Sequence, residues 1–396
     1  MQDAYIVAYG RSAAGRGKAN GTLAHDRPDE VAAQVLKGVL DRVGGEFTLD
    51  MVEDVIVGNS FPEGLQGQNI ARSIALLAGL PNEVPGQTVN RYCSSGLQTI
   101  AHAANQIMAN QADVLVAGGI ELMSAVPMGG NEPTNNPRLQ QEDTGVSYPM
   151  GLTAEMVAEK YNVSREDQDA YAVQSHARAT AAQEAGKFDD EIIAVEVNDV
   201  SYDENGPVVT KKTFDKDELI RTGTNMESLA KLPTIFKKDG TVTAGSSSPL
   251  SDGSGFVVLM SGDKVKELGV KPIARFVAFK AVGVDPKYMG IGPAYAIPEV
   301  LDLAGLTVDD IDLIELNEAF ASQTIASIRE TGIDIEKTNV NGGAISLGHP
   351  LGATGAMLTA RLLAEMKKRE GSRYGMVTMC IGVGMGAAGI FEYIRD

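Results

Sequence analysis

Short apolar runs alternate along this chain with longer stretches that have the spacing of an amphipathic helix. Residues 28–44 place apolar side chains three and four positions apart, which predicts a helix with one buried face. The runs that predict strands lie at residues 4–10, 54–59, 113–119, 312–317 and 374–382. Strands that alternate with helices are typical of an α/β fold.

The pattern occurs twice. Residues 48–59 resemble residues 307–317, and both segments end in Asp-x-Ile-x-x-Asn. Each is followed by a Val-Asn pair, at 89–90 and at 340–341, then by a Gly/Ser-rich turn and a helical pattern. The preserved order predicts an internal duplication of about 120 residues.

A region of different composition separates the two copies. Residues 124–145 are rich in Pro, Asn and Gly, and residues 198–218 have the pattern of a polar hairpin. We therefore expect an inserted loop domain over 122–251. The predicted halves are 1–121 with 252–272, and 273–396.

Length and charge limit the classes of function. A chain of 396 residues suggests two or three domains, and its formal net charge of −18 argues against a nucleic-acid partner. No apolar run approaches the ~18 residues that span a membrane, and the N-terminal segment lacks a basic signal pattern, so we expect a cytoplasmic protein. A phosphorylated small molecule would need local cations, such as Arg221, Lys237 and Lys238.

Cys93 is one of only two cysteines, which lie too far apart in the sequence to suggest a disulfide framework or a zinc site. The residues after it predict a buried helix face at Leu97, Ile100, Ala101, Ala104, Ile107 and Met108. Cys93 therefore lies at or just before a helix N-terminus, where backbone N–H groups and the helix dipole can lower the pKa of a thiol. The alternative is an inert cysteine of the core.

Three further loops carry groups that suit a reactive thiol. His349 lies in the glycine-rich segment 341–356 and could deprotonate a thiol near neutral pH. Asn317 and Glu318 lie at the end of an apolar strand, where an α/β active site places polar groups, although this segment taken alone is better explained as a helix cap. Cys380 ends another strand, before glycines that expose backbone amides. The other histidines, in ordinary contexts, are His25, His102 and His176.

Two segments resemble nucleotide-binding motifs, but the residues around them exclude both assignments. Gly384, Gly386 and Gly389 match the dinucleotide fingerprint G-x-G-x-x-G, but only seven residues follow, too few for the required helix and acidic residue. The loop at 341–356 lacks the Lys-Ser/Thr pair of a phosphate-binding P-loop.

Taken together, these segments resemble the motif set of the thiolases. The matching motifs, in order along the chain, are NRYCSSGLQ, NEAF, NGGAISLGHPLGATG and CIGVGMG. Residues 165–179 and 239–253 also resemble the loop-domain helix and the CoA-binding loop of that family. The resemblance implies a duplicated five-layered αβαβα core with an inserted loop domain, assembled as a homodimer or as a dimer of dimers.

The resemblance also implies roles for single residues. Cys93 would be the acylated nucleophile, His349 its activator, and Cys380 the acid/base at the substrate's α-carbon. Asn317, through a held water, and His349 would form one oxyanion hole, and the amides of Cys93 and Gly382 would form the other. The residues implied in the CoA path are Arg221, Ser228, Ala244, Ser248, Met289 and Phe320. CoA and acyl-CoA are then substrates, with no permanently bound cofactor expected.

Within the family the sequence is most similar to bacterial 3-ketoacyl-CoA thiolases of fatty-acid β-oxidation. Pro149 stands where biosynthetic acetoacetyl-CoA thiolases usually have a histidine, and 232–236 reads LPTIF in place of the usual Leu-Arg-Pro-Ala-Phe. A biosynthetic acetyl-CoA acetyltransferase and a non-catalytic acyl-CoA carrier remain the alternatives. Ketoacyl synthases, which share the fold, have a histidine where this chain has Cys380.

Overall fold

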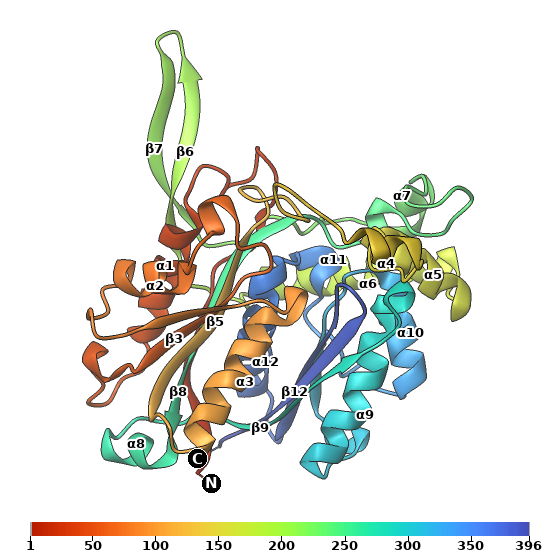
Figure 1. Cartoon of the computed structure of the whole chain (residues 1–396). Coiled ribbons are helices and arrows are strands. Elements are labelled where there is room, and N and C mark those ends of the chain that lie inside the picture. Colours follow the sequence, from red (N-terminus) through yellow and green to blue (C-terminus); the bar gives the residue numbers. More distant parts are fainter. Residues whose placement is uncertain (1, 396) are drawn as a thin grey trace.

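Two similar sets of strands form the centre of the molecule (Figure 1). In the computed structural model, which describes residues 2–395, the N-terminal set has the order β4-β3-β5-β8-β1, and the C-terminal set has the order β10-β11-β12-β9. The sets join where β1 and β9 pair at Tyr5–Arg275 and Ile6–Ala274. The strands of the first set are β1 (Ala4–Arg11), β3 (Asp54–Gly58), β4 (Gly86–Val89), β5 (Val114–Leu122) and β8 (Ser251–Ser261), with the short β2 (Gly15–Arg16) beside β8. Those of the second are β9 (Ala274–Gly283), β10 (Leu313–Leu316), β11 (Tyr374–Ile381) and β12 (Met385–Tyr393).

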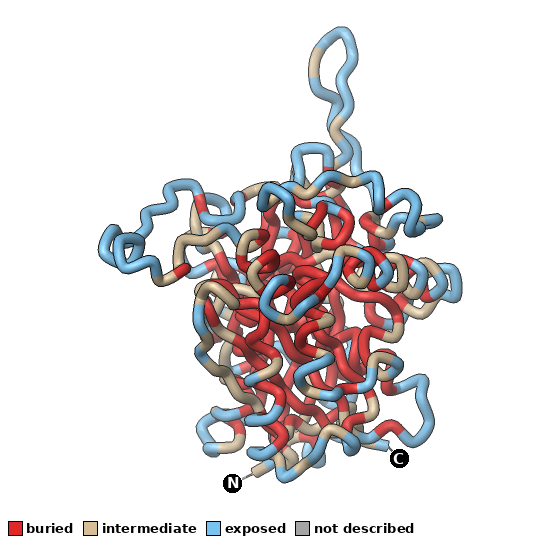
Figure 2. The backbone as a smooth tube through the Cα atoms, turned by 90° about the vertical axis from the view of Figure 1, so that its right-hand side faces the viewer, coloured by how far each residue is buried: buried red, intermediate tan, exposed pale blue. Residues whose placement is uncertain are grey.

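Helices cover both outer faces and fill the space between the two sets of strands (Figure 1). The outer helices of the first half are α1 (Pro28–Leu40) and α2 (Ile70–Leu77), and those of the second half are α9 (Gly292–Ala304) and α10 (Ala321–Thr331). Between the sheets lie α3 (Ser95–Met108) and α12 (Leu351–Lys368). Three large apolar clusters fill the successive interfaces, and Figure 2 shows this buried backbone at the centre of the molecule. The predicted duplicated αβαβα fold is confirmed.

The register of the strands relates the two halves residue by residue. Gly58 on β3 pairs with Gly119 on β5, and Leu316 on β10 pairs with Thr378 on β11. Because Asn59 and Asn317 follow directly after β3 and β10, the two sites are equivalent in this register. Glu121 on β5 therefore occupies the position that Cys380 occupies on β11.

The two central helices cross at a backbone-to-backbone contact. A Cβ atom added to Gly96 would lie 2.8 Å from the backbone nitrogen of Ala356, and one added to Gly355 would overlap the backbone nitrogen of Leu97. Glycine at these two positions therefore lets the helix of each half approach the other closely. The N-terminal ends of both helices meet at this crossing, which places the segments before them side by side.

The chain between β5 and β8 forms a separate group of elements at the top of the molecule in Figure 1. Its elements are α4 (Pro137–Gln141), α5 (Met150–Lys160), α6 (Arg165–Glu184), β6 (Val195–Asp203), β7 (Gly206–Phe214) and α7 (Met226–Ala230). The remaining short helices are α8 (Gly262–Glu267) and α11 (Ala344–Leu347). A capping box of Ser164 and Asp167 starts α6. The exact division of the chain into domains at 121/122 and 251/252 stays a prediction.

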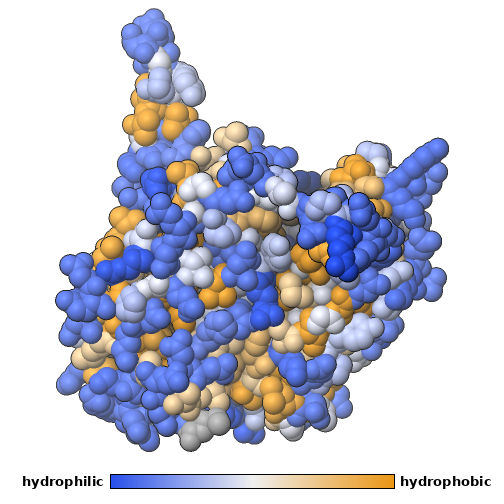
Figure 3. Space-filling model, in the orientation of Figure 1, coloured by the Kyte–Doolittle hydropathy of each residue, from blue (hydrophilic) through white to orange (hydrophobic). Residues whose placement is uncertain are grey.

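Strands β6 and β7 form a hairpin that projects from the body of the molecule (Figures 1 and 3). The hairpin was expected at 198–218 but spans 195–214, because Val195, Val197 and Phe214 are buried at its base and extend the pairing inward. The upper part of the hairpin is hydrophilic in Figure 3.

Two further expectations from the sequence can be compared with the elements. The helix expected over 28–44 ends at Leu40, before Gly44 and Gly45, which both adopt positive φ. Of the glycines in the apparent dinucleotide motif, Gly384 lies in the turn before β12, and Gly386 and Gly389 lie within β12, so a strand and not a helix follows the turn. Within residues 2–395, no helix has both the length and the apolarity needed to cross a membrane.

Candidate active site

Cys93 lies in a tight turn that leads into α3. The turn is a single 3₁₀ segment, Tyr92–Ser94, and Tyr92 adopts a positive φ of 43°, which is unusual for a bulky residue. Ser95 stabilises it, because its Oγ accepts the N–H of Arg91 (2.9 Å) and donates to the carbonyl of Tyr92 (2.6 Å). The sequence prediction of a cysteine just before a helix N-terminus is therefore correct.

The expected lowering of the Cys93 pKa is wrong for this state of the protein. Burial raises the pKa of the Cys93 thiol to about 11, and the negative charge of Glu121 acts in the same direction. Hydrogen bonds from the N–H groups of Gly382 and of Cys93 itself favour the thiolate, but they do not outweigh burial. Cys93 is therefore a protonated thiol that needs a base, and these two amides lie beside its sulfur.

His349 lies between α11 and α12 and is held at three points. Its backbone N–H donates to the Oγ of Ser251 (3.0 Å). Its Nδ1 lies 2.6 Å from the Oγ1 of Thr354, and its Nε2 lies 3.3 Å from the Nδ2 of Asn317. Burial lowers the pKa of His349 to about 3, so the resting ring is neutral and one of its two nitrogens carries no proton.

Asn317 occupies the position directly after β10. Its backbone N–H donates to the carbonyl of Thr378 (2.9 Å) on the neighbouring strand, which fixes its position relative to Cys380. Its side-chain Oδ1 is buried and has no hydrogen-bond partner among the described residues. A buried polar atom of this kind fits the held water that the sequence resemblance implies.

Glu318 supports this loop. Its carboxylate accepts hydrogen bonds from Tyr171 Oη (3.0 Å), Ser175 Oγ (2.7 Å), Asn339 Nδ2 (2.8 Å) and the N–H of Ile345 (3.1 Å). These donors come from α6, from the segment before Asn341 and from α11. Glu318 therefore ties the loop domain to the loops that carry Asn317 and His349.

Cys380 lies near the end of β11, as the sequence predicted, and the structure shows that it is fully buried. Its Sγ donates to the Oε1 of Gln323 (3.5 Å), which also accepts the N–H of Ala319 (3.1 Å). Burial raises the pKa of the Cys380 thiol, and the nearby Cys93 raises it further. Both thiols are therefore protonated, and Cys93 lies close enough to Cys380 for a Cys93 thiolate to disfavour a second one.

The structure places the expected CoA-path residues in two groups. Met289, Phe320 and Cys380 share one apolar cluster, and Phe236 contacts Phe320 edge to face with ring centroids 6.0 Å apart. Ser248 is joined to this wall by its backbone N–H, which donates to Ala319 (2.9 Å). Ala244 is exposed at the start of the neighbouring 3₁₀ segment Ala244–Ser246.

The other two expected residues lie on the exposed loop region. Arg221 presents an exposed side chain, and its backbone N–H donates to the Nδ1 of His176 (3.2 Å). Ser228 forms the reciprocal cap of α7 with Asn225. The structure thus brings Met289, Phe320 and Ser248 to the apolar cluster that contains Cys380, and leaves Arg221 and Ser228 at the surface.

Three residues near the site were missed by the sequence reasoning. Glu121 accepts hydrogen bonds from five N–H donors, on Asn59, Ser60, Phe61, Gln66 and Gly352. Thr354 contacts the imidazole of His349, and Gln323 contacts the thiol of Cys380. Thr354 lies inside the motif NGGAISLGHPLGATG, and Gln323 follows the motif NEAF by about one helical turn, signals that could have identified them, whereas no local pattern marks Glu121.

The arrangement suits acyl transfer through a thioester. It offers one thiol beside two backbone amides, a neutral imidazole, and a second buried thiol with an amide partner. A thiol beside two N–H groups can form an acyl-enzyme whose oxyanion those groups stabilise. A second thiol can move a proton at carbon.

Comparison with known proteins identifies relatives over the whole chain. Residues 4–263 match the family model for the thiolase N-terminal domain, and residues 270–393 match that for the thiolase C-terminal domain. A protein of Bacillus subtilis named 3-ketoacyl-CoA thiolase is 52% identical and is covered over 100% of its length by 99% of this chain. An acetyl-CoA acetyltransferase of Allochromatium vinosum is 44% identical, with 97% of each chain covered. The crystal structure of human mitochondrial 3-ketoacyl-CoA thiolase superposes with a TM-score of 0.88 at 40% identity, covering 99% of both chains.

Proposed function

Because this chain belongs to the thiolase family and is therefore an acyltransferase, we propose that it cleaves 3-ketoacyl-CoA with CoA in fatty-acid β-oxidation. The products are acetyl-CoA and an acyl-CoA shortened by one acetyl unit. The observation that carries this proposal is the convergence of two thiols, one neutral imidazole and one asparagine from four loops at the N-terminal ends of α3 and α12 and the ends of β10 and β11.

In the first half-reaction, Nε2 of His349 takes the proton of Cys93, and the thiolate attacks the keto carbon of the substrate. The N–H groups of Cys93 and Gly382 are placed to stabilise the resulting oxyanion. The bond between the α-carbon and the keto carbon then breaks, which leaves an acyl group on Cys93 and the enolate of acetyl-CoA. Asn317, through a water, and His349 stabilise this enolate until Cys380 protonates its carbon.

In the second half-reaction, the Cys380 thiolate takes the proton of an incoming CoA thiol. The CoA thiolate attacks the acyl-Cys93 thioester, and the Cys93 thiolate leaves and regains its proton from His349. Each thiol therefore returns to its protonated form, and the acyl group leaves as acyl-CoA. The two cysteines have different tasks because one carries the acyl group while the other moves protons.

The degradative direction is supported by two observations. The relative with 52% identity bears the name 3-ketoacyl-CoA thiolase. Pro149 starts α5 where biosynthetic thiolases usually have a histidine, and the following Met150 packs against the cluster that contains Cys380. An apolar wall at this position suits an alkyl chain better than a charged group does.

Steady-state thiolysis rates on a series from acetoacetyl-CoA to 3-ketohexadecanoyl-CoA test this assignment. We expect 3-ketohexanoyl-CoA or a longer homologue to have a kcat/KM at least equal to that of acetoacetyl-CoA. A clear preference for acetoacetyl-CoA would support the second candidate, a biosynthetic acetyl-CoA acetyltransferase, whose name several relatives with 44% identity carry.

The proposal includes assembly and location. We propose a cytoplasmic homodimer or dimer of dimers that uses CoA and acyl-CoA as substrates without a permanently bound cofactor. The open edge of β4 and the exposed Leu65, Leu76 and Leu77 beside it support an interface on that side of the molecule. Light scattering of the purified protein measures the assembly directly.

A further inference from the structure

Thr354 lies on the first turns of α12, five residues after His349. Its Oγ1 is 2.6 Å from the Nδ1 of His349, the shortest hydrogen bond that the imidazole forms, and both residues are buried. On the other side of the ring, Nε2 faces the amide nitrogen of Asn317 at 3.3 Å. An amide nitrogen can only donate, so Nε2 accepts.

These contacts determine the tautomer of the imidazole. A neutral ring whose Nε2 accepts must carry its proton on Nδ1, and Thr354 Oγ1 is the acceptor for that proton. Only in this tautomer is Nε2 free to take the proton of Cys93. We propose that Thr354 is a positioning residue that holds His349 in the tautomer required for deprotonation of Cys93, an inference that rests on the proposed function.

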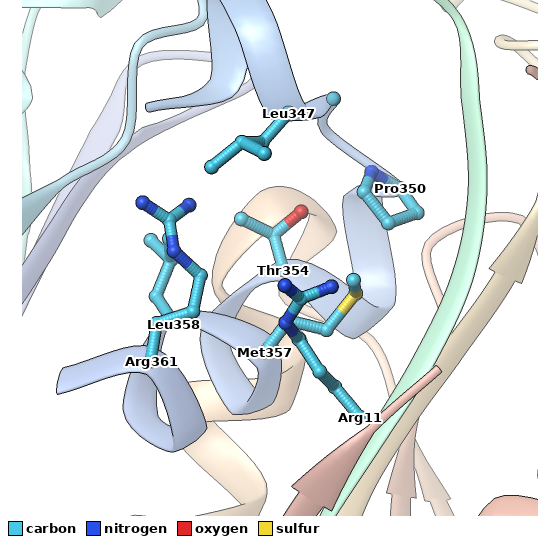
Figure 4. A pocket seen from close by; sticks show the side chains of 8 residues that line it. Arg11, Leu347, Pro350, Thr354, Met357, Leu358 and Arg361 are labelled. Carbon is cyan, nitrogen blue, oxygen red and sulfur yellow. The ribbon is translucent and has the colours of Figure 1, made fainter. Parts of the chain in front are cut away.

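The residues around Thr354 explain why a hydroxyl, and not a carboxylate, contacts Nδ1 of His349. Thr354 lines a cavity of about 10 Å³, which Figure 4 shows together with the guanidinium groups of Arg11 and Arg361. No acidic residue is among the described residues that line it. In a Ser-His-Asp triad a carboxylate occupies the position behind the ring and stabilises the imidazolium, whereas a hydroxyl orients the ring without adding charge. Thr354 therefore fixes the proton on Nδ1 and leaves the resting imidazole neutral.

Replacement of the Thr354 hydroxyl should move the imidazole proton of His349 from Nδ1 to Nε2. In Thr354→Val, Nδ1–H would face a methyl group, and an unpaired buried donor is unfavourable. The neutral ring would then carry its proton on Nε2, where Asn317 Oδ1, which has no partner among the described residues, can accept it after the amide turns over. Nε2 could no longer accept the proton of Cys93, but it could still donate to an enolate.

Two half-reactions measured separately test the proposal. We expect Thr354→Val to slow acetylation of Cys93 by acetyl-CoA, measured by rapid quench and mass spectrometry, by about 10–100-fold. Exchange of acetyl-CoA α-protons in heavy water should fall by less than threefold, and Thr354→Ser should restore acetylation. The ¹⁵N shifts of His349, assigned with His349→Ala, should report protonated Nδ1 in the unmodified protein and protonated Nε2 in Thr354→Val.

A matched control lies on the same helix. Thr359 is also fully buried on α12, and among residues 2–395 its hydroxyl donates to the carbonyl of Gly355 (2.8 Å) alone. Thr359→Val should therefore leave both half-reactions unchanged. Equal loss of acetylation in both variants, equal loss of both half-reactions in Thr354→Val, or an unchanged ¹⁵N pattern would overturn the role of Thr354. Failure of the unmodified protein to acetylate Cys93 would instead contradict the proposed function.

Discussion

In the N-terminal half, β3 leads into Asn59 and the neighbouring β5 carries Glu121; in the C-terminal half, β10 leads into Asn317 and β11 carries Cys380. The backbone positions of Glu121 and Cys380 are equivalent, but the two side chains differ in how many hydrogen bonds the protein makes to them. Glu121 receives five N–H donors from the protein. Cys380 has one weak partner, and Gln323 beside it retains an unpaired buried amide nitrogen among the described groups.

This difference shows how equivalent positions in a duplicated fold can take different roles, one that stabilises loops and one that takes part in the reaction. Because every partner of Glu121 is a donor, the site suits a carboxylate, which fixes the loop after Asn59 and the start of α12 through Gly352. His349 precedes α12, so the polar site of the N-terminal half helps to position a base that the C-terminal half contributes. The largest effects on catalysis should therefore come from the C-terminal position, and the largest effects on folding from the N-terminal one.

The two thiols should give the largest effects. Cys380→Ala should still yield acetylated Cys93 by mass spectrometry but lose carbon–carbon cleavage by about 10²–10⁴-fold, since the departing enolate then lacks the thiol that protonates its carbon. Cys93→Ala should form no acyl-enzyme and retain α-proton exchange. Brief treatment with iodoacetamide should label the partly buried Cys93 before the fully buried Cys380. Near-normal thiolysis by Cys380→Ala, or active-site acylation of Cys93→Ala, would contradict these roles.

Glu121 should show the reverse profile. Glu121→Ala leaves five N–H donors, four of them buried, without this acceptor and should lower the free energy of unfolding by about 3–5 kcal/mol. Cys380→Ala is the matched variant in the other half, and it should cost only about 1 kcal/mol. Urea titrations followed by circular dichroism provide the measurement, since the chain has no tryptophan. A similar loss of stability in both variants would remove the distinction between the halves.

The two asparagines allow the comparison to be made with one substitution. Asn317→Ala should lower kcat for thiolysis by about 10²–10³-fold, because it removes one support of the enolate. Asn59 donates to the carbonyl of Ile120 (3.0 Å) and to Glu121 (3.3 Å), so Asn59→Ala should cost about 1 kcal/mol of stability. Its kcat should remain near that of the unmodified protein, and a hundredfold loss would assign Asn59 to the chemistry.

Asp252 should give a smaller effect than Glu121, and its effect depends on pH. It begins the pairing of β8 with β5 at the position that Met385 occupies in the other half. Burial raises the pKa of Asp252 to about 7, although hydrogen bonds from Ser124 act in the opposite direction. Between the ordinary carboxyl pKa and pH 7 the native state therefore binds a proton that the unfolded state does not.

The free energy of unfolding should consequently fall as pH rises, by about 2–3 kcal/mol from pH 5 to pH 8. Asp252→Asn should remove this part of the pH dependence, and Met385→Leu should leave it intact. Urea titrations at both pH values measure it, and equal pH slopes in Asp252→Asn and the unmodified protein would contradict the prediction.

The sequence predicted the fold well because both of its signals are local. Strand-length apolar runs and the repeated Asp-x-Ile-x-x-Asn segment identified the two halves, and Gly-rich turns before helical patterns located Cys93 and His349. The protonation of Cys93 could not be predicted, because burial depends on how α12 and β11 close over the turn. The role of Glu121 could not be predicted for the same reason, because its hydrogen-bond donors come from segments far apart in the sequence.

The close crossing of α3 and α12 has a consequence for synthesis on the ribosome. The inner face of the N-terminal half is covered by a helix that begins at Leu351, so it stays open until almost the whole chain has been made. Leu97, Ile100 and Ile107 lie on that face, and each is fully buried in the finished molecule. A nascent chain that has completed its first half therefore presents an apolar surface for chaperones to bind, and the two halves reach their native state together.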